Sequence, residues 1–119
     1  MKENLIKEKS FKFALKIIEL CNKLKWKNEF IIYKQLLKSW TSIWANIEEA
    51  IAGQSKKDFL MKMSIANKEA RETRYWLLLI KESKIIEDDI EYYLEEIESI
   101  LNIVTKITKT TRINLNSDI

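Results

Sequence analysis

The sequence predicts an all-α protein that folds as an antiparallel up-down-up-down four-helix bundle. The chain of 119 residues has no proline and a single glycine, which disfavours sheets joined by tight turns. Apolar residues recur at helical spacing along four segments, and the connections between these segments are short. Short connections make neighbouring helices antiparallel. With 46% hydrophobic residues, residues 1–119 fit one domain with one core.

The first helix is expected over about residues 10–24, where apolar residues recur every three or four positions. Ser10 is suited to be its N-cap, because its hydroxyl can accept from a free backbone N–H. The second helix is expected over residues 29–52, with Asn28 as its cap. Gly53 would then end it in the left-handed conformation, which glycine adopts without strain.

The third helix is expected over residues 56–82, after Ser55, which opens a capping-box pattern with an aspartate in place of the usual glutamate. The fourth is expected over residues 88–110, with Glu87 or Asp88 as its cap. The polar residues that follow are expected to form a frayed tail.

The composition excludes several classes of chemistry. The chain has no histidine, so it lacks Ser-His and Cys-His pairs and the Glu-x-x-His motif of di-iron bundles. The single cysteine, Cys21, excludes an internal disulfide and multi-cysteine zinc motifs. We therefore expect no catalytic residue, metal or cofactor. No segment resembles a signal peptide or a membrane span, so a cytoplasmic protein without membrane contact is expected.

Charge is distributed unevenly along the chain. Residues 1–28 carry a balance of +5 and residues 83–119 a balance of −4. The candidate nucleic-acid-binding residues are Lys9, Lys12, Lys16, Lys23, Lys25, Lys27, Lys56, Lys57, Lys68, Arg71 and Arg74. For a monomer, a solvated lysine face is the simpler interpretation. In a closed ring of subunits the same lysines are repeated, and RNA or DNA binding becomes the favoured one.

Two further features bear on that choice. Trp26 lies between two lysines and could stack on an unpaired base or pack against a helix. The acidic fourth helix is expected to lie away from bound nucleic acid, or to dock a basic partner protein.

A row of polar residues follows the apolar face of the second helix and continues on the third. It consists of Ser39, Ser42, Asn46, Glu49, Glu69 and Glu72. An antiparallel pair of helices would set Ser42, Asn46 and Glu49 opposite Glu72, Glu69 and Lys62. The favoured interpretation is a hydrogen-bonded ladder that fixes helix register. The alternative is an oxygen-only metal site, which would make Glu49, Glu69 and Glu72 part of a metal-dependent enzyme.

Apolar residues exceed what one small bundle needs. The surplus positions are Phe13, Leu15, Trp40, Trp44, Ile51 and Leu78, which lie at the margins of the predicted core faces. A small monomer that exposed several of these side chains would be prone to association. The sequence therefore predicts a homo-oligomer.

Three segments carry a resemblance to a known family. They are SF at residues 10–11 with Ala14, QLLKSWTSIWANIEEAIAGQSKKDF at 35–59 and SIANKEARETRYWLLLI at 64–80. They resemble the bacterial four-helix-bundle proteins encoded by intervening sequences of large-subunit ribosomal RNA genes. Related to that family is the accessory variability determinant of diversity-generating retroelements. The resemblance covers roughly residues 3–112.

The resemblance implies a four-helix protomer that assembles into a ring-shaped homopentamer. The retroelement branch implies nucleic-acid binding beside a reverse transcriptase and its template RNA. The family's recurring positions correspond to Ser39, Ser42, Asn46, Glu49, Glu69, Glu72, Tyr75 and Trp76, and Lys38 stands where arginine is common. The leading hypothesis is thus a non-enzymatic oligomer that binds nucleic acid. The alternative is a protein-only scaffold with no nucleic-acid role.

Overall fold

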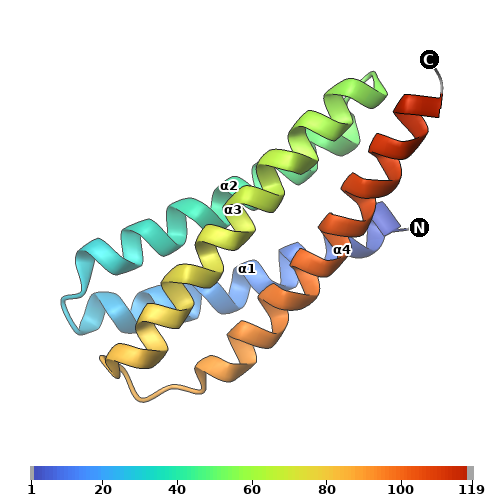
Figure 1. The fold of residues 1–119 in the computed structure, drawn as a ribbon. Coiled ribbons are helices and arrows are strands. Elements are labelled where there is room, and N and C mark those ends of the chain that lie inside the picture. The colour runs from blue at the N-terminus through green and yellow to red at the C-terminus, as the bar shows by residue number, and fades with distance from the viewer. Residues whose placement is uncertain (1, 118–119) are drawn as a thin grey trace.

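The computed structural model describes the backbone of residues 2–117 and the side chains of residues 5–116. It contains four long α-helices, which are α1 (Lys2–Trp26), α2 (Phe30–Ala52), α3 (Lys56–Ser83) and α4 (Ile90–Ser117). They form a rod with principal extents of 52 × 21 × 20 Å. Figure 1 shows the helices running side by side with their connections at alternate ends. The predicted all-α four-helix bundle is confirmed.

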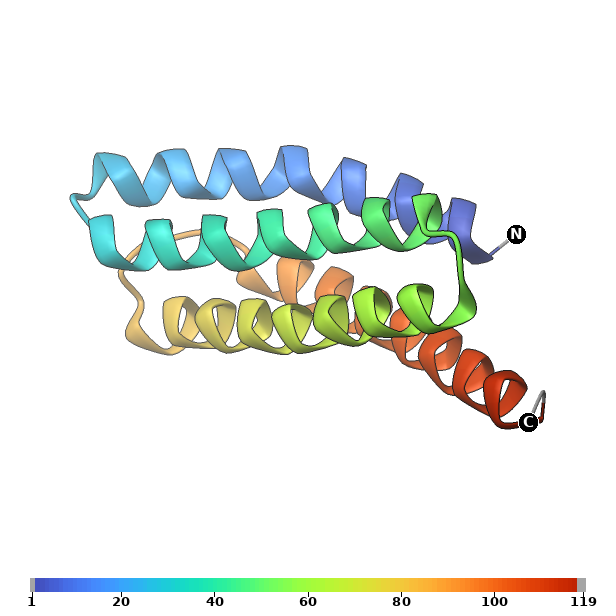
Figure 2. The same ribbon diagram turned by 90° about the horizontal axis from the view of Figure 1, so that it is seen from above.

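Each helix packs against the next one along the chain, and α4 closes the bundle by contacting α1. The contact between α1 and α4 is the least extensive of the four. Figure 2 shows the reason, because α4 turns away from α1 toward its carboxyl end. Among the described residues, no helix combines the length and the apolar composition that a bilayer crossing needs.

Aromatic rings fill the middle of the core, where α1, α2 and α4 meet. The rings of Phe13 and Trp40 lie 4.9 Å apart, edge to face, and the ring of Tyr93 lies 6.1 Å from that of Phe13. Phe13 and Trp40 are almost fully buried, so the prediction that they were surplus to the core was wrong. The buried face of each helix is wider than the apolar stripe predicted from helical periodicity, because each helix packs against two neighbours.

Helix α1 begins near Lys2, well before the predicted start at residue 10. Ile6 is fully buried, and the apolar area that it removes from water stabilises the additional turns. Ser10 consequently lies inside the helix and is not its N-cap. Its Oγ is buried and has no hydrogen-bond partner among the described residues.

Helix α4 continues to Ser117, although the sequence predicted a frayed tail after about residue 110. Two threonine hydroxyls donate to carbonyl oxygens one turn earlier in the same helix, Thr108 to Val104 and Thr111 to Ile107, both at 2.8 Å. These bonds satisfy the polar side chains within the helix. The helix also begins two residues later than predicted, at Ile90, and the Asp88 carboxylate accepts from Lys23 at 2.8 Å.

At the corner between α2 and α3, the predicted cap of α3 is confirmed and the predicted conformation of Gly53 is wrong. Ser55 is the N-cap of α3, and its Oγ accepts from the Asp58 N–H at 3.1 Å. Gly53, in contrast, is extended (φ −65°, ψ 155°) and not left-handed. A Cβ at this position would lie 3.2 Å from the carbonyl oxygen of Ala50, so the absence of a side chain permits a close approach of backbone.

The left-handed residues are at the other two corners. Asn28 has φ 62° and lies two positions after the end of α1, so it belongs to the end of that helix and does not cap α2 as predicted. Glu29 is the residue that precedes α2. Lys84, with φ 55°, ends α3. Asparagine tolerates this conformation, whereas lysine adopts it at a cost of about 1 kcal/mol.

Candidate nucleic-acid interface

The lysines predicted to form a basic stripe on α1 are engaged in ion pairs. Lys12 pairs with Glu8 at 3.1 Å and Lys16 with Glu19 at 3.7 Å, both within the helix. The other two reach across to α4 and its preceding loop. Lys9 pairs with Glu96 at 3.2 Å and Lys23 with Asp88 at 2.8 Å. On α3, Arg74 pairs with Glu98 of α4 at 2.6 Å.

These pairs follow from the topology of the bundle. An up-down-up-down arrangement places the acidic fourth helix beside both basic helices, α1 and α3. The acidic helix therefore lies beside the basic stripe, whose lysines it and its preceding loop partly neutralise. Exposed ion pairs contribute only about 0–1 kcal/mol each, so a phosphate could still compete for Lys12 and Lys16. The positive charge of the stripe is nevertheless largely compensated within the molecule.

Several basic residues have no carboxylate partner among residues 5–116, and they lie on α3, on the second half of α4, and on α1 and α2 near their shared corner. We define the corner surface as Lys25 and Lys27 at the end of α1, together with Lys34 and Lys38, which follow along α2. All four side chains are exposed, and none has a carboxylate partner among residues 5–116. Lys34 and Lys38 are four positions apart and share one face of α2. Neither lysine was among the predicted nucleic-acid-binding residues, although their spacing along one face of α2 could have identified them.

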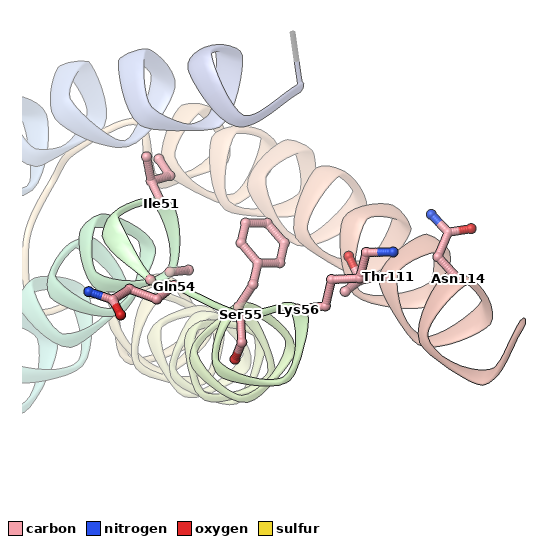
Figure 3. Close-up of a pocket in the computed structure, with 9 residues that line it drawn as sticks. Ile51, Gln54, Ser55, Lys56, Thr111 and Asn114 are labelled. Carbon is pink, nitrogen blue, oxygen red and sulfur yellow. The ribbon is translucent and has the colours of Figure 1, made fainter. Parts of the chain in front are cut away.

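The remaining candidate nucleic-acid-binding residues lie on α3, which is separated from α1 by α2. Lys57, Lys68 and Arg71 are exposed, and the Arg71 guanidinium donates to the Asn67 side chain at 3.0 Å. Lys56 lies at the start of α3 and lines a hollow of about 420 Å³. Figure 3 shows the two sides of this hollow, with Gln54, Ser55 and Lys56 on the α2–α3 corner and Thr111 and Asn114 on α4.

The polar row joins α2 to α3. The Ser39 hydroxyl donates to the Leu36 carbonyl oxygen at 3.2 Å, and its Oγ lies 2.9 Å from the Thr73 hydroxyl. Glu49 pairs with Lys62 at 3.0 Å, as the wheel analysis predicted. Thr73 was missed, although it belongs to the quoted segment of α3. It is the residue that connects Ser39 to the neighbouring helix.

These contacts fix the register between the two helices. Because the helices are antiparallel, three residues forward from Ser39 correspond to three residues back from Thr73. Ser42 therefore lies at the level of Ala70, and not of Glu72 as predicted. Asn46 donates to the Ser42 carbonyl oxygen at 2.8 Å, within its own helix. Among the described residues, two contacts of the row cross between α2 and α3, Ser39 with Thr73 and Glu49 with Lys62.

The carboxylates of the row do not assemble a metal centre. Glu69 and Glu72 are half-buried, and Glu49 lies at the other end of the row beside Lys62. In the part of the chain whose side chains are described, no group of three His, Cys, Asp or Glu residues converges as metal ligands do. The arrangement gives no support to the metal-dependent enzyme.

Two buried groups are held in their protonated forms. Burial raises the pKa of the Cys21 thiol to about 11. Burial, followed by the charge of Asp88, raises the pKa of Tyr93 to about 12. The Tyr93 hydroxyl donates to the Lys16 carbonyl oxygen at 3.3 Å. A nucleophile or a general base needs the opposite shift, so neither group is activated for chemistry at neutral pH.

An apolar stripe runs along the outside of α1. It consists of Phe11, Leu15 and Ile18, which are 48–55% exposed and recur at positions i, i+4 and i+7. The ring of Phe11 lies 5.8 Å from that of Trp44 on α2, so the stripe extends across the groove between the two helices. The stripe is one part of the exposed apolar surface, and of the predicted surplus residues Leu15 lies in it, whereas Leu78 is exposed on α3.

The fold and this site define a class, that of small all-α four-helix-bundle proteins with an uncompensated basic corner and an exposed apolar stripe. Within it, the chain belongs to the family of 23S rRNA-intervening sequence proteins, whose model matches residues 2–106. The resemblance seen in the sequence is thereby confirmed.

One solved structure makes the relationship concrete. It is the crystal structure of a protein of unknown function from the S23 ribosomal protein family of Bacteroides thetaiotaomicron. The two chains are 40% identical, with a TM-score of 0.86, over 92% of this chain and 99% of the other. No curated protein matches this chain.

Proposed function

We propose that the protein is a non-enzymatic, self-associating bundle that binds nucleic acid through its basic surface. The observation that carries this proposal is the corner surface, where four lysines have no carboxylate partner among the described residues. Lysines without intramolecular partners can neutralise phosphates and release the counterions condensed on them. Lysines read phosphate and not base sequence, so the binding is weakly sequence-specific.

Self-association increases the number of lysines that can contact phosphates on one particle. A second copy that covers Phe11, Leu15 and Ile18 would remove exposed apolar surface from water and place several corner surfaces on one particle. The family resemblance sets the expected subunit number at five. It also suggests a cytoplasmic role as accessory to the reverse transcriptase of a diversity-generating retroelement. Neighbouring genes for a reverse transcriptase and variable repeats would support that branch of the family.

Fluorescence anisotropy of a labelled structured RNA tests the binding, at about 50 and 200 mM salt. About five simultaneous phosphate contacts would lower the affinity roughly a hundredfold between the two conditions. The double variant Lys34→Ala/Lys38→Ala should reduce the slope of log affinity against log salt by about 1.4–1.8. The matched control is Lys12→Ala/Lys16→Ala, which removes equal charge from lysines that are already paired, and it should have a smaller effect.

Light scattering after size exclusion tests the assembly. Leu15→Glu should dissociate the oligomer, because it places a charge in the middle of the apolar stripe. Leu15 is 55% exposed, so the protomer should remain folded. Asn102→Glu introduces the same side chain at an exposed position of α4 and should leave the mass unchanged.

The alternative function is a protein-only scaffold. Ion-paired surfaces between helices, such as Lys9 with Glu96, are also found in proteins that only bind other proteins. Absence of RNA and DNA binding at the lower salt concentration would overturn the nucleic-acid proposal and favour this scaffold.

A further inference from the structure

The corner between α1 and α2 contains a hollow of about 520 Å³ lined by two aromatic rings, two amides and a lysine. Its lining residues are Asn22, Lys25, Trp26, Asn28 and Phe30. Trp26 is 87% exposed, more than any other large apolar side chain among the described residues, and Phe30 is 45% exposed. A tryptophan with so little cover in a chain that buries 25 other apolar side chains points to a ligand.

The backbone turn that carries Trp26 is hydrogen-bonded. The Asn28 N–H donates to the Lys25 carbonyl oxygen at 3.0 Å, and the Glu29 N–H donates to the Leu24 carbonyl oxygen at 2.9 Å. These bonds and the left-handed Asn28 define the turn that carries Trp26. The ring of Phe30 packs edge to face on Tyr33, with centroids 6.0 Å apart. The indole of Trp26 has no ring partner among the described residues, so its face is open.

The chemistry of the corner matches a nucleotide in three respects. Lys25 and Lys27 flank Trp26 and have no carboxylate partner among the described residues, so they can contact phosphates. The open indole offers a flat surface on which a base can stack. Asn22 and Asn28 supply amide donors and acceptors for the edge of that base.

A lipid surface fits less well. An interfacial anchor needs a continuous apolar face, whereas Asn22 and Asn28 interrupt the apolar lining of this hollow. Ile31, which is 77% exposed, projects about 100° away from Phe30 around α2 and does not extend that lining. The rings are therefore set among polar groups, as in sites for single-stranded nucleic acids.

We propose that this corner is a stacking site for an unpaired nucleobase, with Trp26 as the platform and Lys25 and Lys27 on the adjacent phosphates. The proposal rests on the proposed nucleic-acid function and specifies its ligand as a single-stranded segment, loop or bulge. Bases inside a duplex are stacked on one another and cannot reach the indole.

The test compares two RNA probes of equal length, a labelled single-stranded oligonucleotide and a blunt duplex. Loss of one stacked base weakens affinity by about fivefold to a hundredfold. Trp26→Ala should therefore weaken binding of the single strand about tenfold or more, and binding of the duplex less than twofold. Trp26→Phe keeps an aromatic surface and should retain most of the affinity. Both variants should fold, because the side chain makes little contact with the core.

The outcomes separate this inference from the function on which it rests. If wild-type protein binds neither probe, nor the same two probes made of DNA, the proposed function fails, and the stacking site fails with it. If wild-type protein binds but Trp26→Ala leaves both affinities unchanged, or lowers both equally, only the stacking site is overturned. A variant that loses binding to phosphatidylserine vesicles but not to RNA would assign the corner to a membrane surface. A change in particle mass would assign it to contact between copies.

Discussion

Two serines on core-facing positions should respond in opposite ways to the same substitution. Ser10 and Ser39 are both buried inside helices, yet Ser39 is hydrogen-bonded to Thr73 whereas the hydroxyl of Ser10 has no partner among the described residues. A buried polar group without a partner costs about 1–3 kcal/mol, and alanine favours a helix over serine by a few tenths of a kcal/mol. Ser10→Ala should therefore increase the free energy of unfolding by about 1–2 kcal/mol.

Ser39→Ala should decrease the free energy of unfolding by about 0.5–1 kcal/mol. The variant loses the bonds of Ser39 with Leu36 and with Thr73, but Thr73 keeps its second acceptor, the carbonyl oxygen of Glu69 at 2.9 Å. Urea denaturation followed by circular dichroism measures both, at one protein concentration because the oligomer couples stability to concentration. A destabilised Ser10→Ala variant, or two changes of the same sign with equal m-values, would refute the reasoning.

Further predictions concern the corners and the single thiol. Lys84→Gly should stabilise the fold by about 0.5–1 kcal/mol in the same denaturation assay, since lysine is strained at φ 55°; a loss of stability would contradict this. Native protein at pH 8 should react with iodoacetamide at least about tenfold more slowly than unfolded protein, because burial raises the pKa of Cys21 to about 11. Because the pKa of Cys21 is higher in the folded protein, its neutral thiol stabilises the fold fully below the ordinary pKa of 9.0, and this stabilisation is lost as pH rises through about 11. Denaturation curves of wild-type protein and of Cys21→Ala across this pH range measure the loss.

The sequence was a good guide where local spacing decides the structure. The faces of α2 and α3 follow from helical periodicity, and the predicted pair of Glu49 with Lys62 forms. Ser55 caps α3 as its sequence pattern indicated. Both features depend on residues close together along the chain or on adjacent helices joined by a short corner.

The errors arise where distant segments meet. Whether Lys23 is free or paired depends on Asp88, which lies 65 positions away and approaches only when α4 closes the bundle. Ile6 extends α1 because of the core that it enters, and no local signal announces this. The corner surface was partly missed for a similar reason, since Lys34 and Lys38 stand out only once the other lysines are found to be paired.

The ion pairs between α1 and the acidic residues of α4 and its preceding loop lead to a prediction about function. If these acidic residues weaken nucleic-acid binding by occupying the lysines of α1, removal of one of them should strengthen the binding. Asp88→Asn frees Lys23 and should add about one phosphate contact, which raises affinity roughly threefold to tenfold at low salt. Glu95→Gln changes the net charge equally at an exposed position and should raise affinity less than twofold. Equal gains in the two variants would mean that net charge alone governs binding, and that the pairing of individual lysines does not select where phosphates bind.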